Sequence, residues 1–185
     1  MNKQAIFSAT RRCLRCLPLA ALLLTGVTQA QSKFEEDFDD TEKPWQEIAV
    51  QLPAAPKQEN LIPFYVSPTA TYTFSIDTKS LSVGSDAVVR YTLMAKGSGG
   101  AENISYEGIR CKSKERKLYA FGRKDGSWSR SHRDKWEPIT QHVSNPYHAI
   151  LMTDFLCDGE AVAGSADDIA RHLRMKPVAD RYMPK

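Results

Sequence analysis

Residues 87–111 read AVVRYTLMAKGSGGAENISYEGIRC, and this stretch decides the fold class. Apolar residues occupy every second position over 87–95, which is typical of a strand with one buried face. The glycine-rich loop KGSGG then turns the chain, and Ile104 and Tyr106 mark the inner face of a second strand. After Gly108 the apolar phase shifts by one residue, which favours a β-bulge. The stretch therefore predicts two antiparallel strands joined by a short loop.

Three further strands are indicated, one before this pair and two after it. Residues 72–77 show the same alternation of apolar and polar side chains. Residues 117–131, KLYAFGRKDGSWSRS, hold Asp125 and Gly126 between two strand-like runs, a signal for a two-residue type I′ hairpin. Because the connections are mostly short, we expect the strands to form one antiparallel sheet.

The C-terminal third is expected to be helical. Asn145 suits an N-cap with Pro146 at the first helical position, and apolar residues then recur at helical spacing up to Cys157. A second helix is predicted to start at Ser165, with Asp168 completing a capping box. The fold class is therefore α+β, an antiparallel sheet of about five strands followed by two C-terminal helices.

Residues 1–30 have the organisation of a cleaved secretory signal. A basic start is followed by an apolar run over 17–27 and by small residues at 28–30 that suit a signal peptidase. The alternative, a retained membrane anchor, is disfavoured because a span needs about 20 apolar residues. We expect a periplasmic mature protein that starts at Gln31, has no transmembrane anchor, and is free to associate with the outer membrane.

Removing the signal changes how the cysteines and the charge are interpreted. Cys13 and Cys16 form a C-x-x-C, but they lie in the discarded segment. Only Cys111 and Cys157 remain, which in an oxidising compartment predicts one structural disulfide rather than a thioredoxin-like pair. Closing a loop of this size contributes about 4 kcal/mol. The signal holds four of the 25 basic residues and none of the 22 acidic ones, so the mature charge is 21 − 22 = −1.

The mature chain is expected to divide into an N-terminal arm (31–68), an α+β domain (69–176) and a tail (177–185). Residues 34–47 carry seven acids against one lysine, and five prolines fall within 44–68. Such a segment is unsuited to continuous sheet pairing or to a helix. The arm either lies along its own domain or engages a partner.

Motifs for catalysis and metal binding are absent from the sequence. Ser98 lies in a glycine-rich loop rather than in a G-x-S-x-G elbow. No phosphate-binding loop precedes a helix, and the histidines lack paired ligand spacing, so neither a cofactor nor a metal is expected. The histidines are His132, His142, His148 and His172. Glu107, beside the predicted bulge, is interpreted either as a solvent-facing strand residue or as an acid of a small periplasmic hydrolase.

Positive charge is concentrated within residues 110–135, where ten basic residues stand against three acids, a net of 10 − 3 = +7. In an exported protein such a surface would meet lipopolysaccharide, lipid headgroups or glycans rather than nucleic acid. Two alternatives are cations that guard a sheet edge and cations that are shielded by the acidic arm. The candidate anion-binding residues are Arg123, Lys124, Arg130 and Trp128.

Three segments together resemble a known family. They are GSDAVVRYTLMAKGSGGAENISYEGIRC (84–111), YAFGRKDGSW (119–128) and YHAILMTDFLC (147–157). They resemble the CNP-like family of uncharacterised exported envelope proteins of betaproteobacteria, over residues 60–175. The resemblance implies export and an envelope setting and supplies no catalytic residues. Residues 31–50 and the tail fall outside it.

Three functions follow from these observations. The first is a non-catalytic binding or envelope-maintenance module that contacts an anionic envelope component through the basic aromatic hairpin. The second is a small hydrolase that uses carboxylates near Glu107. The third is an assembly subunit that docks on an envelope protein through its N-terminal arm.

Overall fold

The computed structural model describes residues 44–133, 135–140 and 146–175. All of them lie in one unit of the chain, Lys43–Lys185. The predicted signal, the acidic start of the arm, the predicted tail, His142 and the predicted cap Asn145 lie outside the described residues.

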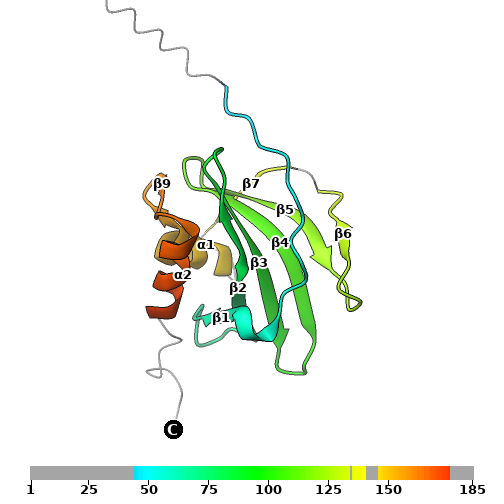
Figure 1. Ribbon diagram of the computed structural model, residues 1–185. Coiled ribbons are helices and arrows are strands. Elements are labelled where there is room, and N and C mark those ends of the chain that lie inside the picture. The colour runs from blue at the N-terminus through cyan, green and yellow to red at the C-terminus, as the bar shows by residue number, and fades with distance from the viewer. Residues whose placement is uncertain (1–43, 134, 141–145, 176–185) are drawn as a thin grey trace, which may run out of the picture. The chain divides into compact units, whose positions relative to one another are not determined.

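Seven strands form one antiparallel sheet in the order β1-β2-β3-β4-β5-β6, with β7 also paired to β5 (Figure 1). The strands are β1 (Leu61–Phe64), β2 (Tyr72–Val83), β3 (Val88–Gly97), β4 (Glu102–Arg110), β5 (Glu115–Gly122), β6 (Trp128–Arg130) and β7 (Glu137–Pro138). A two-stranded sheet is made by β8 (Cys157–Asp158) and β9 (Ala161–Val162). The helical elements are the 3₁₀ turn η1 (Gln58–Asn60), α1 (Tyr147–Leu151), the π-helical turn η2 (Met152–Leu156) and α2 (Ala166–Met175). The α+β class with an antiparallel sheet is confirmed, and the main sheet is wider than the five strands expected.

Part of the difference in strand number comes from the proline-rich segment. Residues 61–64, which the sequence analysis places in an extended arm, form β1 and pair antiparallel with β2. Pro63 is tolerated there because β1 is an edge strand, so one side of its backbone needs no partner in the sheet. The sheet therefore begins inside the segment that the prolines mark as irregular.

The β5–β6 hairpin forms at Asp125 and Gly126 as predicted, but with a different turn. Arg123 N–H donates to Ser127 O at 2.8 Å, which leaves three residues in the loop. Gly126 has φ +83°, and Asp125 is not among the residues with positive φ. A type I′ turn needs positive φ at both central residues. The loop is instead a three-residue connection closed by a left-handed glycine.

The β2–β3 and β3–β4 hairpins use the same kind of loop. Gly97 N–H donates to Ala101 O at 2.8 Å, and Gly100 is the left-handed residue, with φ +82°. Gly84 N–H donates to Val88 O at 3.0 Å in the β2–β3 loop. There the left-handed residue is Ala87, with φ +58°.

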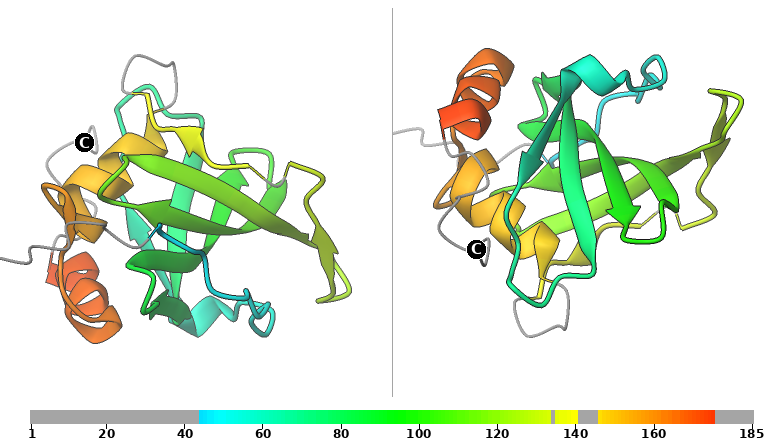
Figure 2. Two further views of the ribbon diagram at one scale, coloured as in Figure 1. Left: turned by 90° about the horizontal axis from the view of Figure 1, so that it is seen from above. Right: turned by 90° about the horizontal axis from the view of Figure 1, so that it is seen from below.

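Helices cover one face of the sheet, which we call the inner face (Figure 2). α2 contacts β1 and β2, and α1 continues directly into η2. The core between sheet and helices includes Phe64, Phe74, Ile76, Tyr91, Leu93, Ile109, Leu151, Phe155, Leu156, Ile169 and Leu173. This arrangement leaves part of the inner face of β4 and β5 outside the helical layer.

The opposite, outer face is covered by the arm. Residues 44–57 cross it without regular secondary structure, and Val50 and Leu52 contact a cluster on β4 and β5. The cluster consists of Tyr106, Tyr119 and Ala120, with Trp128 beside it. Because both faces are covered, β3 is buried from Val88 to Met94 rather than on alternate residues. The described part of the arm therefore lies along its own domain, which is one of the two alternatives that the sequence left open.

β4 differs from its predicted orientation. Glu107 and Ile109 point to the inner face, whereas Tyr106 belongs to the outer cluster. Side chains of β4 continue to alternate between the two faces through Gly108, so the strand has no change of phase there. The sequence suggested a change because both faces of β4 are covered and polar residues occupy two of its inner positions. The register shift lies beside Glu107, where Tyr119 of β5 is the extra residue. A Cβ on Gly108 would lie 2.6 Å from the Tyr119 hydroxyl, so glycine is required for this approach.

The predicted disulfide joins Cys111, directly after β4, to Cys157, directly after η2, with 5.7 Å between the Cα atoms. It therefore ties the sheet to the helical layer. The predicted capping box is also present, since Ser165 Oγ and Asp168 exchange hydrogen bonds at the start of α2. α1 begins at Tyr147, so Pro146 occupies the N-cap rather than the first helical position.

Candidate functional site

The first half of the basic stretch is engaged within the fold. The Arg110 guanidinium lies 4.1 Å from the centre of the Trp45 ring and 3.4 Å from Glu115. Arg116 pairs with Glu137 at 2.8 Å. These ion pairs hold the ends of β4 and β5 within the fold.

The second half has a different environment. Its cations are exposed and form no ion pair with a described acid. They lie on β6, on the loop before it and on the segment after it, at one edge of the sheet. We call this set the cationic edge; it comprises Arg123, Lys124, Arg130, Arg133 and Lys135. Three of the four predicted anion-binding residues thus lie at this edge. Arg123 contacts Ser129 on the inner face, whereas Arg130 lies opposite Ala120 on the outer face.

The loop that carries two of these cations is ordered by its own polar groups. Asp125 Oδ1 accepts hydrogen bonds from the Ser127 N–H at 2.9 Å and from its hydroxyl at 2.6 Å. These bonds to Ser127 hold the pKa of Asp125 below its usual value. Arg123 Nη2 donates to Ser129 Oγ at 3.2 Å across the hairpin.

Trp128, the fourth predicted residue, does not face outward. Its indole N–H donates to Pro53 O of the arm at 2.7 Å, and its ring lies 6.1 Å from that of Tyr106. Trp128 therefore holds the arm to the sheet, and its indole N–H is engaged within the fold.

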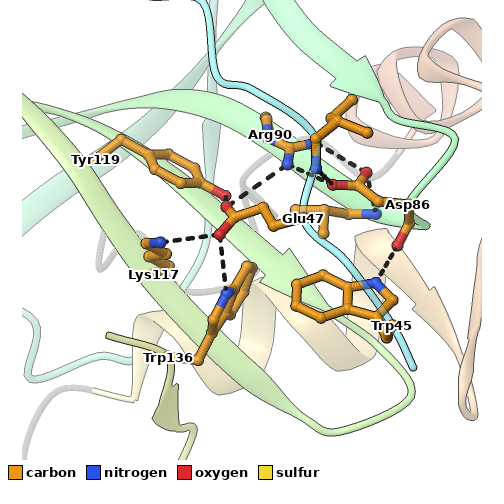
Figure 3. A network of polar contacts seen from close by, with 9 residues as sticks. Trp45, Glu47, Asp86, Arg90, Lys117, Tyr119 and Trp136 are labelled. Carbon is orange, nitrogen blue, oxygen red and sulfur yellow. Dashed lines mark hydrogen bonds and ion pairs between the residues drawn. The ribbon is translucent and has the colours of Figure 1, made fainter. Parts of the chain in front are cut away.

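The arm is fixed by a single carboxylate, Glu47 (Figure 3). Its oxygens accept hydrogen bonds from Tyr119 at 2.7 Å, Lys117 at 2.8 Å and Trp136 at 3.3 Å. Arg90 Nη2 lies 3.7 Å from Glu47 Oε1. We call this group the arm clamp. One acid of the arm thus neutralises part of the basic stretch, as the shielding alternative expects.

A second buried pair supports the arm clamp. Arg90 binds Asp86 through both carboxylate oxygens, at 2.6 and 3.1 Å, and Asp86 also accepts the Ile48 N–H at 3.1 Å. The Trp45 indole donates to Asp86 O at 2.8 Å (Figure 3). Burial acts to raise the pKa of Asp86, but the bonds from Arg90 and the backbone outweigh it, so this pKa lies below its usual value.

Glu107 is buried on the inner face, with 4 % of its surface exposed, so it is not a solvent-facing strand residue. It accepts hydrogen bonds from Ser105 at 2.6 Å and Tyr91 at 3.2 Å, and its Oε2 lies 2.7 Å from His148 Nε2. Burial acts to raise the pKa of Glu107, but His148, Ser105 and the Arg116 charge outweigh it and lower this pKa. Three donors therefore hold the carboxylate in its charged form.

Glu47 and His148 are functional candidates that the sequence did not single out. Glu47 is one of seven acids in its segment, and its partners are 70 to 89 residues away. His148 lies 41 residues from Glu107. The one signal in the sequence that could have pointed to Glu47 is its position between the apolar arm residues Trp45 and Ile48.

Within the described ranges, no three His, Cys, Asp or Glu side chains are arranged to hold a metal ion. In the same residues, no helix has both the length and the apolar character needed to cross a bilayer.

Comparison with known proteins identifies a family. A search of curated proteins and a search of solved structures each find no match. The model of the CNP1-like family matches residues 40–174, so the match also includes Glu47 of the arm clamp, which the resemblance seen in the sequence left out. The match covers most of the 185 residues and confirms that resemblance. The chain belongs to the CNP1-like family.

Proposed function

We propose that this chain is an exported, non-catalytic binding module of the cell envelope that contacts an anionic component through its cationic edge. The observation that carries the proposal is the division of the basic stretch. Arg110, Arg116 and Lys117 pair with acids of the fold. The cations of the cationic edge, in contrast, are exposed and form no ion pair with a described acid. A mature chain with a net charge of −1 thus presents a group of five exposed cations at one edge of the sheet.

The chemistry of the cationic edge favours phosphate or carboxylate groups. Arginine offers paired N–H groups that match the oxygens of both anions, and Arg123, Arg130 and Arg133 are each exposed. In the periplasm such groups belong to lipopolysaccharide, to lipid headgroups and to acidic glycans. The periplasmic setting itself is inferred from the signal-like residues 1–30.

Binding to lipopolysaccharide and to vesicles of anionic phospholipid tests the proposal. We expect an affinity that falls as salt is raised, because exposed charges are screened beyond about 8 Å at physiological ionic strength. The combined variant R123Q/K124Q/R130Q should lose most of this affinity. No binding of the native chain to either probe at low salt would refute the proposal.

A matched control separates the cationic edge from general charge. The variant K57Q/K79Q/R174Q removes the same number of exposed cations from other elements. It should bind as the native chain does. Equal losses in the two variants would mean that net charge, rather than the cationic edge, drives binding.

A hydrolase at Glu107 is the second candidate, because Glu107 and Glu102 line one cavity of about 330 Å³. We rank it lower for two reasons. Three donors already hold Glu107, and Glu102 pairs with Lys96 at 2.9 Å. Neither acid is left as an unoccupied general base.

Docking through the arm is the third candidate. Its described part, residues 44–57, is engaged with its own sheet through Glu47, Val50, Leu52 and Pro53. A partner would therefore have to bind residues 31–43 or displace the arm clamp.

A further inference from the structure

The inner face of β3, β4 and β5 contains a cavity of about 330 Å³, which we call the inner groove. Tyr147, the first residue of α1, forms one wall of it. Its floor is formed by Leu93 and Ala95 of β3 and by Leu118 of β5. Its Phe121 end adjoins the cationic edge, because Phe121 pairs with Ser129, which accepts a hydrogen bond from Arg123.

The polar end of the inner groove offers both hydrogen-bond donors and hydrogen-bond acceptors. Glu107 uses three of its about four acceptor positions on Ser105, Tyr91 and His148, which leaves one for a ligand. Arg116 uses Nη2 on Glu137 and keeps its other N–H groups. The Tyr147 hydroxyl has no hydrogen-bond partner among the described residues.

The charges of the inner groove nearly cancel. Glu102 and Glu107 are countered by Arg116 within the lining and by Lys96, which pairs with Glu102. A site for an anion would carry an excess of cations, as the cationic edge does. A balanced set of donors and acceptors instead matches a neutral ligand whose groups both donate and accept, which is the property of a hydroxyl.

An exposed aromatic ring stands at the other end of the inner groove. Phe121 lines the groove with 51 % of its surface exposed, the largest exposure of any aromatic residue described. Phe121 lies opposite Ser105 in the β4–β5 register, so both point to the inner face. A flat apolar ring beside hydroxyl-binding groups suits the C–H face of a sugar ring.

The size of the inner groove agrees with this chemistry. At about 30 Å³ for each water-sized group, its volume holds roughly eleven non-hydrogen atoms. A pyranose sugar has about this number. We infer that the inner groove binds one neutral sugar residue of a glycan, with Phe121 against the ring and Glu107, Arg116 and Tyr147 on its hydroxyl groups.

An NMR titration of the mature chain with N-acetylglucosamine, and separately with glucose, tests this inference. We expect the amide signals of Ser105, Leu118 and Phe121 to shift with either or both sugars, and the stronger response identifies an acetamido or a plain sugar. Phe121→Ala should weaken binding about fivefold, since contacts of aromatic rings contribute about 1 kcal/mol. Tyr72→Ala, which removes an exposed ring outside the inner groove, should have no effect.

The two proposed sites respond differently to salt and to substitution. Sugar binding should persist at high salt and in R123Q/K124Q/R130Q, whereas anion binding should not. If Phe121→Ala does not fold, Asn103→Ala, which removes an exposed amide of the lining, takes its place. The inference is overturned if neither sugar shifts these signals up to its solubility limit, or if the shifts are the same in the folded variant.

Discussion

Ala87 closes the β2–β3 loop in a backbone conformation that glycine adopts in the β3–β4 and β5–β6 hairpins. Its φ is +58°, beside +82° for Gly100 and +83° for Gly126. A side chain at such a position is strained by about 1–2 kcal/mol. The loop tolerates this strain because the preceding residue, Asp86, is fixed by Arg90.

Ala87→Gly should therefore stabilise the protein by about 0.5–1 kcal/mol, after allowing for the greater freedom of glycine in the unfolded chain. Urea unfolding measures this as a higher midpoint with an unchanged slope. Ala101→Gly is the control, because Ala101 is exposed and has no positive φ. It should leave stability unchanged or lower it. A loss of stability in Ala87→Gly would contradict the strain argument.

Asp86 should make stability depend on pH at acid values. Its pKa is lowered below 3.8 in the folded protein, so the unfolded state takes up the proton more readily. The stabilisation is complete above the unfolded value and is lost as pH falls through the folded pKa. Asp86→Asn should be less stable than the native protein at pH 7, and its free energy of unfolding should change less with pH in this acid range. Urea unfolding across pH measures both effects. Asp158→Asn, at an exposed position of β8, should keep the native profile.

At the scale of elements, the arm behaves as a cover for the outer face. Glu47 supplies its polar anchor, and Val50 and Leu52 supply its apolar contacts. Without the arm, Tyr119 and Lys117 would lose their carboxylate partner, and the aromatic cluster would be exposed to water. The arm is therefore part of the folded domain from residue 44 onward.

A chain that begins at residue 58 should unfold at a lower temperature than one that begins at residue 44. Partial burial of two aliphatic side chains contributes about 2–3 kcal/mol, which corresponds to roughly 10 °C for a domain of this size. Thermal unfolding followed by circular dichroism compares the two chains. Equal melting temperatures would show that the arm clamp contributes nothing to stability.

Local patterns predicted most of the elements, and the arm explains where they failed. Alternation located β2 and β3, and the Ser165 capping box located α2. The orientation of β4 could not be predicted, because alternation assumes that one face meets water. Here Tyr106 is buried under the arm and Glu107 is buried under α1, so hydropathy does not distinguish the faces. The candidate cations were found because charge is local in sequence, whereas Glu47 and His148 act through distant partners.

At the scale of the whole molecule, the sheet separates three surfaces. Helices and the disulfide lie on the inner face, the arm lies on the outer face, and the cationic edge follows β6. The disulfide is the covalent link between the sheet and the helical layer, because Cys111 follows β4 and Cys157 follows η2.

Replacing both Cys111 and Cys157 by alanine should lower the free energy of unfolding by about 4 kcal/mol. The loss should appear as a lower melting temperature without a change in the sheet's circular dichroism at low temperature. In a chain prepared from residue 31 onward, intact mass should show no alkylated thiol until reduction. Two alkylated thiols before reduction would mean that the bridge is absent from the protein as made.

The arm clamp also has a consequence for the order of folding. Glu47 must find Lys117 and Trp136 across 70 and 89 residues, whereas the three hairpins from β2 to β5 close through loops of a few residues. Local closures precede distant ones because the entropic cost of closure grows with loop length. The arm is then the last element to join and the first to leave. We expect Glu47→Ala to accelerate unfolding in stopped-flow measurements while leaving the refolding rate nearly unchanged.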